Sequence, residues 1–314
     1  MFISSTRTYQ INEAVSRLQE NGRFAIIFLT PEIRQAGYSG CLQDATKFVN
    51  TLNNPSSYNL DFKTGLQGFD ALGPGLGWSP AADATIVSPL AGSDIITLRG
   101  LSAEDGVYLE KLMNDSTADL KVTDGTTNIA DDDILLVTDC EAAAVFQVTN
   151  YTIANGNVVH NTGTGTPGNA ITNLGHAFKP GAEIARIRTS SFFIRTNPNG
   201  QPALYRTDYP NIAGMPATFE LVEGIENMQI RYGVAANSSK SSPITSYATA
   251  AGVADWDSVK SVRIALLVRT LNEINGLDSD TSTYSVNGVD VVAPGDRRLR
   301  HVFTTTIGIR NRLP

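Results

Sequence analysis

The feature that most constrains the fold is a long amphipathic segment at the start of the chain. Between residues 8 and 36 the apolar side chains recur at helical spacing and share one face. The residues of this face are Ile11, Val15, Leu18, Ala25, Ile26, Leu29 and Ile33. No later segment repeats the pattern, so the helix must bury this face on something other than a second helix.

A proline near the end of this segment predicts a break in the helix. Pro31 cannot donate a hydrogen bond to the carbonyl of Ile27, so we expect a kink or a restart there. Thr30 can cap the restarted turn, and Gly37 is expected to end the helix.

The rest of the chain is typical of antiparallel β-sheet with long loops. Residues 42–89 are rich in glycine, proline and asparagine and predict a loop region. Later segments are β-branched and bounded by turn residues. The predicted strands are 94–101, 133–138, 145–153, 183–196, 203–207, 228–234, 262–270 and 298–310. In the last two, apolar residues alternate with arginines, so Arg263, Arg298 and Arg300 are expected to face solvent.

Composition and charge exclude several classes of protein. The 314 residues carry a net charge of −7, which argues against general affinity for nucleic acid or anionic lipid. No apolar run reaches the roughly 18–20 residues that span a bilayer. With 41% apolar and 18% charged residues, the chain has ample material for a core and is not disordered.

The two cysteines leave two interpretations open. Cys41 and Cys140 could be inert buried thiols. Both lie at the ends of predicted elements, however, and we favour a bridge between them. Such a bridge closes a loop of about 100 residues and places the protein outside the cytoplasm.

The motifs of catalysis and ligand binding are weak or absent. A formal GxGxxG spans residues 163–168, but polar loop follows it where a dinucleotide site needs a helix. Residues 131–133 are three aspartates, which could bind calcium but more often form a solvated strand edge. The sequence has no GxSxG and no HExxH, and its three histidines are scattered. We therefore expect no enzyme, no catalytic residue, no cofactor and no metal site.

Three stretches together resemble one protein family. YQINEAVSRLQENGRFAIIFLTPEIRQAGYSGC at residues 9–41 resembles the segment that follows the hydrophobic N-terminus in minor pilins of the PilW family. FELVEGIENMQIRYGV, then DWD before VKSVRIALLVRT, then DRRLRHVFTTTIGIRNRLP resemble the closing motifs of that family in the same order. Residues 42–130 match no pattern of the family that we can name.

The resemblance implies a fold and a domain organisation. The expected fold is α+β and pilin-like, with a long N-terminal helix packed on antiparallel sheet. The expected parts are the second half of a pilin helix at residues 1–37 and a β-rich head at residues 38–314. The peptidase site and hydrophobic half-helix of the family are absent, so Met1 is expected to be an artificial start. The stretch AANSSKSSP at residues 235–243 holds no carboxylate where relatives are acidic, so no calcium site is expected there.

The resemblance also implies a function. The chain is expected to be a structural minor pilin that helps initiate type IV pilus assembly, supports adhesion and twitching motility, and remains in the tip complex. Its partners would be other minor pilins, the major pilin and a tip adhesin. Its location would be the inner membrane and periplasm before assembly and the extracellular pilus afterwards. Two alternatives stay open: a J-type pseudopilin of type II secretion, and a ligand- or DNA-binding tip module.

Two sets of residues follow as candidate sites. The first would pack the helix on the sheet and consists of Ile11, Val15, Leu18, Ala25, Ile26 and Leu29. The second is a candidate tip or partner surface at Arg298 and Arg300, for which a solvated sheet face is the simpler explanation.

Overall fold

A computed structural model describes residues 2–42, 45–73, 75–101, 106–209 and 216–313, without the side chains of residues 2–7 and 45. The fold begins with the single helix α1 (Phe2–Arg34), and nineteen short or long strands follow. Up to residue 159 these are β1 (Phe48–Asn50), β2 (Leu66–Ala71), β3 (Trp78–Ser79), β4 (Ile95–Leu101), β5 (Val107–Tyr108), β6 (Leu120–Lys121), β7 (Ile134–Thr138), β8 (Ala143–Gln147), β9 (Asn150–Thr152) and β10 (Asn157–Val159).

The later strands include the longest ones. They are β11 (Glu183–Thr196), β12 (Pro202–Tyr209), β13 (Ala217–Glu223), β14 (Ile225–Ala235), β15 (Ile244–Ala248), β16 (Val259–Arg269), β17 (Thr283–Val286), β18 (Val289–Val292) and β19 (Arg300–Gly308). Five single 3₁₀ turns complete the described elements: η1 (Ala45–Lys47), η2 (Ile153–Asn155), η3 (Ala250–Gly252), η4 (Trp256–Ser258) and η5 (Arg310–Arg312).

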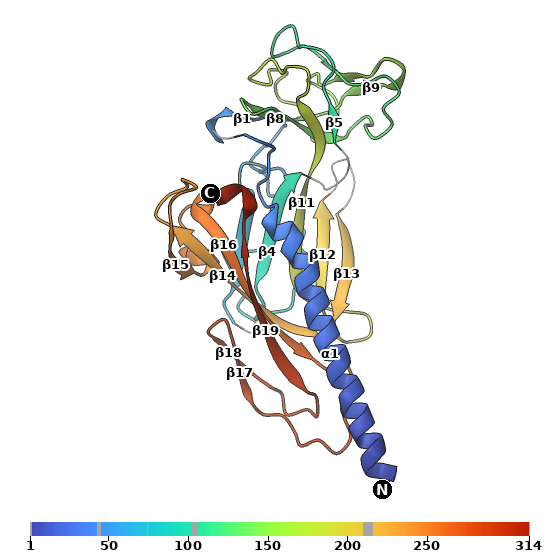
Figure 1. Cartoon of the computed structure of the whole chain (residues 1–314), viewed down its shortest axis with the longest axis vertical. Helices are drawn as coiled ribbons and strands as arrows, with labels where there is room; N and C mark the ends of the chain where they lie inside the picture. The colour runs from blue at the N-terminus through green and yellow to red at the C-terminus, as the bar shows by residue number, and fades with distance from the viewer. Residues whose placement is uncertain (1, 43–44, 74, 102–105, 210–215, 314) are drawn as a thin grey trace.

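The described strands form four sheets. A ten-stranded sheet has the order β1-β8-β7-β11-β4-β2-β3, with β5 and β12 also on β11 and β13 on β12. A four-stranded antiparallel sheet has the order β15-β14-β16-β19, and β6-β10-β9 and β17-β18 are smaller. The long strand β11 pairs at its start with β7 and β5 and further along with β4 and β12, so it runs from the upper part of the molecule into the body (Figure 1).

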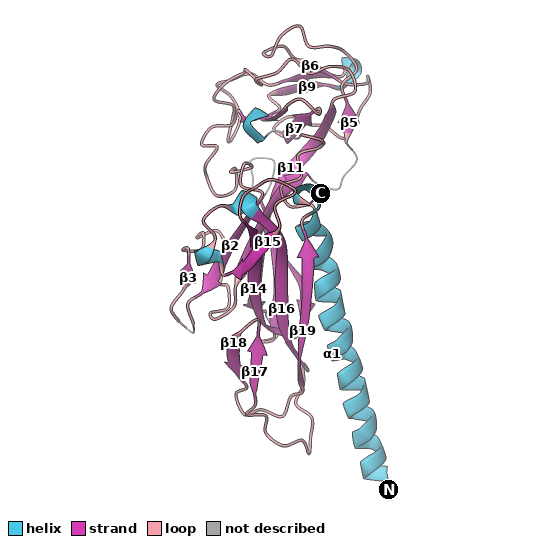
Figure 2. Cartoon of the chain, turned by 60° about the vertical axis from the view of Figure 1, so that its left-hand side comes forward, coloured by secondary structure: helices cyan, strands magenta, loops and turns pink. Residues whose placement is uncertain are grey.

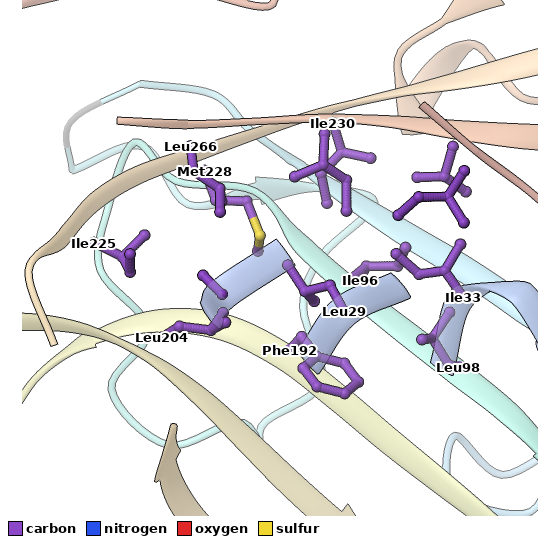
Figure 3. Packing of buried hydrophobic residues seen from close by; sticks show 14 of the residues in the cluster. Leu29, Ile33, Ile96, Leu98, Phe192, Leu204, Ile225, Met228, Ile230 and Leu266 are labelled. Carbon is purple, nitrogen blue, oxygen red and sulfur yellow. The ribbon is translucent and has the colours of Figure 1, made fainter. Parts of the chain in front are cut away.

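The helix lies between two sheets. α1 contacts β19 and β16 of the four-stranded sheet on one side and β13 of the ten-stranded sheet on the other. Figure 3 shows the helix residues Leu29 and Ile33 between Met228 and Ile230 above and Phe192 below. One core therefore joins α1 to both sheets, and strands far apart in sequence meet there.

The predicted α+β, pilin-like fold class is wrong. The chain is mostly β-sheet, with 40% of residues in strands, 14% in helix, one N-terminal helix and several sheets. The prediction failed because alternation identifies a strand but does not show how strands divide into sheets. The expectation left the number of sheets open, and the helix here lies between two of them.

The predicted restart of the helix at Pro31 is also wrong. α1 continues through Pro31 to Arg34 as one helix. Thr30 does not cap a new turn; its hydroxyl donates to the carbonyl of Ile26 at 2.7 Å. Because Pro31 lies within the last turn of the helix, only the bond to the carbonyl of Ile27 is lost, and packing of Ile33 and Ala36 in the core holds the end in place.

The part of the chain from residue 106 to 182 has a core of its own. Its apolar residues include Leu120, Phe146 and Phe178, which are fully buried. This outer part lies at the end of the molecule opposite the N-terminus of α1 (Figure 2). It carries nine acidic and three basic residues, so most of the net charge of −7 is concentrated there.

A buried carboxylate joins the two large sheets. Asp94 precedes β4, is 2% exposed, and accepts hydrogen bonds from the amides of Ala71 in β2 and Ile230 in β14, both at 2.8 Å. Burial raises the pKa of Asp94 to about 7; the two amide hydrogen bonds oppose this rise, and nearby Asp70 adds to it. The junction between the sheets therefore contains a group that titrates near neutrality.

We expect this group to make stability fall as the pH rises from about 4 to 7. The pKa of Asp94 is about 7 in the folded chain against the ordinary value of 3.8, so the folded state binds the proton more tightly. Below pH 4 the tighter proton binding adds roughly 4 kcal/mol to the free energy of unfolding, and this contribution is lost as the pH rises to about 7. Urea unfolding at pH 4, 5.5, 7 and 8 should show this slope in the parent and not in Asp94→Asn.

Asp290→Asn is the control for this experiment, because Asp290 is an exposed carboxylate on strand β18 of the β17–β18 hairpin. The control variant should keep the parent slope. If parent and Asp94→Asn lose stability in parallel over this pH range, Asp94 does not titrate at the junction.

Candidate functional site

The inner face of α1 is the first candidate site. Leu18, Ala25 and Leu29 are buried to 5% exposure or less. Ile26 is partly buried and packs against the same core, while Ile11 and Val15 lie closer to the start of the helix and are half-buried. The structure thus brings the predicted residues onto one face, with burial that increases towards the end of the helix.

One feature of this face was not predicted from the sequence. Gly22 lies where α1 crosses β19, and a Cβ there would overlap the ring of Phe303. Ile33, which helical spacing placed on the same apolar face but which was not among the six candidate packing residues, is fully buried. A glycine inside an apolar helix was the available signal, because such a position often marks a close approach.

Charges fix the orientation of the helix on the ten-stranded sheet. Glu32 accepts from Arg188 Nη2 of β11 at 2.6 Å, and Arg206 Nη1 of β12 lies 3.8 Å away. The three side chains are about one-quarter exposed, so solvent weakens the pairs. Their main role is to set the register of α1 against β11 and β12.

The segment that follows α1 is bonded first to β4 of the ten-stranded sheet and then to the outer part of the molecule. Gly37, with a φ of +68°, donates its amide to the carbonyl of Arg99 at 2.7 Å and lies against Gly65. A few residues on, a disulfide joins Cys41 to Cys140 in the turn between β7 and β8. The segment after α1 is therefore tied to β4 and to the outer part of the molecule.

The second candidate site, at Arg298 and Arg300, is different from the expected surface. The side chain of Arg300 is 0% exposed and contacts three carboxylates. Its Nε donates to Glu226 at 2.6 Å, and its Nη1 donates to Asp296 at 2.7 Å and to Asp280 at 3.1 Å. The expectation that Arg300 faces solvent, where it could bind a partner or DNA, is wrong.

The reason is that the second face of the four-stranded sheet is covered. Ala265 and Leu267 of β16 are buried under Val286 of the β17–β18 hairpin. The segments around Asp280 and Asp296 continue this cover down to Arg300. Alternation placed the arginine on the correct side of the strand but could not show that a hairpin lies over it.

Electrostatics explain how a buried arginine is tolerated. Burial alone would lower the pKa of Arg300, but its hydrogen bonds to Asp296 and Glu226 outweigh this and raise the pKa above its usual value. The hydrogen bond from Arg300 holds the pKa of Asp296 well below its usual range. Both groups stay charged over the ordinary pH range, so this cluster clamps β14 to β19.

Arg298 is the more exposed of the two arginines. Its side chain is 20% exposed, and Nη1 lies 3.0 Å from Asp296 and 3.7 Å from Glu273. It extends the same network towards the loop after β16. The two arginines therefore belong to one structural cluster.

A cleft of about 910 Å³ lies where the segment after α1 approaches the loop before β15. Tyr38, Phe62, Lys63 and Lys240 line it. Arg99 in its wall donates to the carbonyls of Tyr58 at 2.6 Å and Thr64 at 2.8 Å. That buried charge therefore ties β4 to the loop between β1 and β2 at two points.

The aspartates at residues 131–133 and the glycine loop at residues 163–168 make structural contacts. Asp133 is buried and pairs with Arg186 at 2.8 Å, and Asp131 accepts from the amide of Tyr151. The glycine loop at residues 163–168 packs on Gln147, whose Oε1 accepts from the Gly168 amide at 2.7 Å. Within the described ranges, no group of three or more metal-binding side chains is present. No helix among the described residues has the length and apolar character needed to cross a bilayer.

One family model matches the later part of the chain. A family model described as "Type IV Pilus-assembly protein W" matches residues 191–311. The match supports a PilW-family type IV pilus protein. No curated protein and no solved structure matches the chain.

The PilW match covers a defined part of the fold. It begins in the second half of β11 and runs through β12 to β19, so it contains the whole four-stranded sheet and the Arg300 cluster. The helix α1 and the outer part at residues 106–182 lie before it. PilW is a pilus-assembly family, which supports a role in type IV pilus assembly together with other pilus components.

Proposed function

We propose that the chain is a minor pilin, a structural subunit that helps initiate type IV pilus assembly and remains in the tip complex. The observation that carries the proposal is the PilW match over residues 191–311. That range supplies strands β13, β16 and β19, which hold α1.

The placement of α1 is consistent with this role. The end of the helix is fixed by the core, by Gly37 and by the ion pairs of Glu32. Its start extends past the lower end of the sheets (Figure 2). In our proposal the subunit is held in the inner membrane from this side before assembly, and its acidic outer part faces away from the membrane.

The role we propose is structural and involves no catalysis. The buried side chains of Asp94 and Arg300 bond to backbone amides and to opposite charges of the same chain, respectively. Such contacts stabilise the fold, which fits a structural subunit. The partners in this proposal are other minor pilins, the major pilin and a tip adhesin, first in the periplasm and later on the extracellular pilus.

We expect deletion of the gene, in its natural cell, to reduce the number of surface filaments. Because an initiating subunit acts before elongation, the major pilin should still be made and should accumulate in the membrane. Electron microscopy would count the filaments, and immunoblots of sheared and membrane fractions would follow the major pilin.

The complemented strain is the control and should regain its filaments. Parent-like piliation in the deletion strain would end the assembly role. Loss of protein secretion with unaffected pili would instead support the pseudopilin alternative.

A further inference from the structure

The outer edge of β13 offers unpaired backbone groups. β13 pairs with β12 over residues 217–223, and no other described strand pairs with it. Ala217, Phe219 and Glu220 are exposed. An edge strand of this length presents a row of amide donors and carbonyl acceptors that an added strand can use.

Two phenylalanines of α1 lie beside this edge. Asn21, Phe24, Phe28 and Glu32 are three or four residues apart and form one flank of the helix. Asn21 Nδ2 donates to the carbonyl of Glu223 at the end of β13, and Glu32 lies by Arg206 of β12. Since both ends of the flank contact these strands, Phe24 and Phe28 between them run along β13.

A third aromatic residue joins them from the strand itself. Phe219 stands opposite Arg206 in the register of β13 and β12, and the Arg206 guanidinium lies 5.8 Å from the centre of its ring. Because Arg206 also faces Glu32, Phe219 is on the same side of the sheet as α1. Phe24, Phe28 and Phe219 are 41%, 43% and 47% exposed, which is unusual for three neighbouring aromatic rings.

We propose that the edge of β13 with Phe24, Phe28 and Phe219, here called the β13 strip, binds an extended strand of a neighbouring pilus subunit. The proposal rests on the proposed function. The backbone edge selects a strand, because only an extended segment satisfies a row of strand amides and carbonyls. The three rings provide apolar contacts for alternate side chains of that strand.

The charge of the strip favours a different subunit over a second copy of this chain. β13 reads ATFELVE and contains two glutamates and no basic residue, so self-pairing would bring acidic edge to acidic edge. Like charges across a strand pair are destabilising. The expected partner strand therefore carries basic residues among alternating apolar ones.

Photocrosslinking in piliated cells tests the proposal. Benzoyl-phenylalanine is placed in the full-length protein at Phe219, at Phe24, or at Val292 on the remote hairpin strand β18, which is 66% exposed. Irradiation should join positions 219 and 24 to one peptide of another pilus subunit, with at least tenfold less product at position 292. Mass spectrometry would map the peptide.

A second variant separates binding from folding. Phe219→Ser in the chain labelled at Phe24 should lower the crosslink yield at least tenfold while the thermal unfolding midpoint stays near that of the parent. An unchanged yield would overturn the proposal, and so would crosslinks from position 219 that reach only its own chain.

The outcomes also distinguish the strip from the proposed function. If piliation needs the protein but positions 219 and 24 crosslink to no other pilus subunit, the strip is wrong and the function stands. If deletion leaves piliation normal and the adduct is with a protein outside the pilus, both proposals fail.

Discussion

Leu29→Asp is expected to unfold the protein or to lower its free energy of unfolding by at least 4 kcal/mol. Leu29 is 1% exposed and lies between the two sheets, where a carboxylate would have neither water nor a cationic partner. The loss combines the apolar contacts of leucine with the cost of burying a charge. Urea unfolding followed by far-ultraviolet circular dichroism would measure it.

The matched control lies two residues away on the same helix. Ile27 is 51% exposed and faces away from the sheets, so Ile27→Asp should change the free energy of unfolding by about 1 kcal/mol or less. Equal losses in the two variants would show that α1 is not buried between the sheets through Leu29.

Replacing both Cys41 and Cys140 by serine should lower the free energy of unfolding by about 4–5 kcal/mol. The bridge spans 99 residues of sequence, so its removal raises the conformational entropy of the unfolded chain and favours unfolding. Urea unfolding of the double variant and of the parent with reductant should give the same loss.

A thiol assay tests the bridge directly. The parent, denatured without reductant, should react with no thiol reagent, because both cysteines are bridged. Two reactive thiols would contradict the bridge. A double variant as stable as the parent would show that other contacts already constrain the loop that the disulfide closes.

Local patterns predicted the parts of the fold that depend on neighbouring residues. The strand predicted at residues 183–196 matches β11 at both ends, and the segment at 262–270 corresponds to β16. The apolar face of the helix was also visible, because its period is a local property of the sequence. Burial of Leu18, Ala25 and Leu29 follows from that period.

The errors concern contacts between distant segments. Nothing near Arg300 indicates that Asp280 and Glu226 approach it, or that a hairpin at residues 283–292 covers the sheet. The edge strand β13 was missed because only one of its seven side chains is buried and the burial does not alternate clearly. For the same reason no sequence signal showed that α1 lies beside this edge.

The strand shared by the outer part and the body has a mechanical consequence. β11 continues without interruption from its pairs with β7 to its pairs with β12, so one strand connects the outer part to the body. Its ladder hydrogen bonds run across the strand. A tension applied along β11 would therefore load many of these bonds at once instead of peeling them one by one, and the strand would carry the load from the outer part into the body.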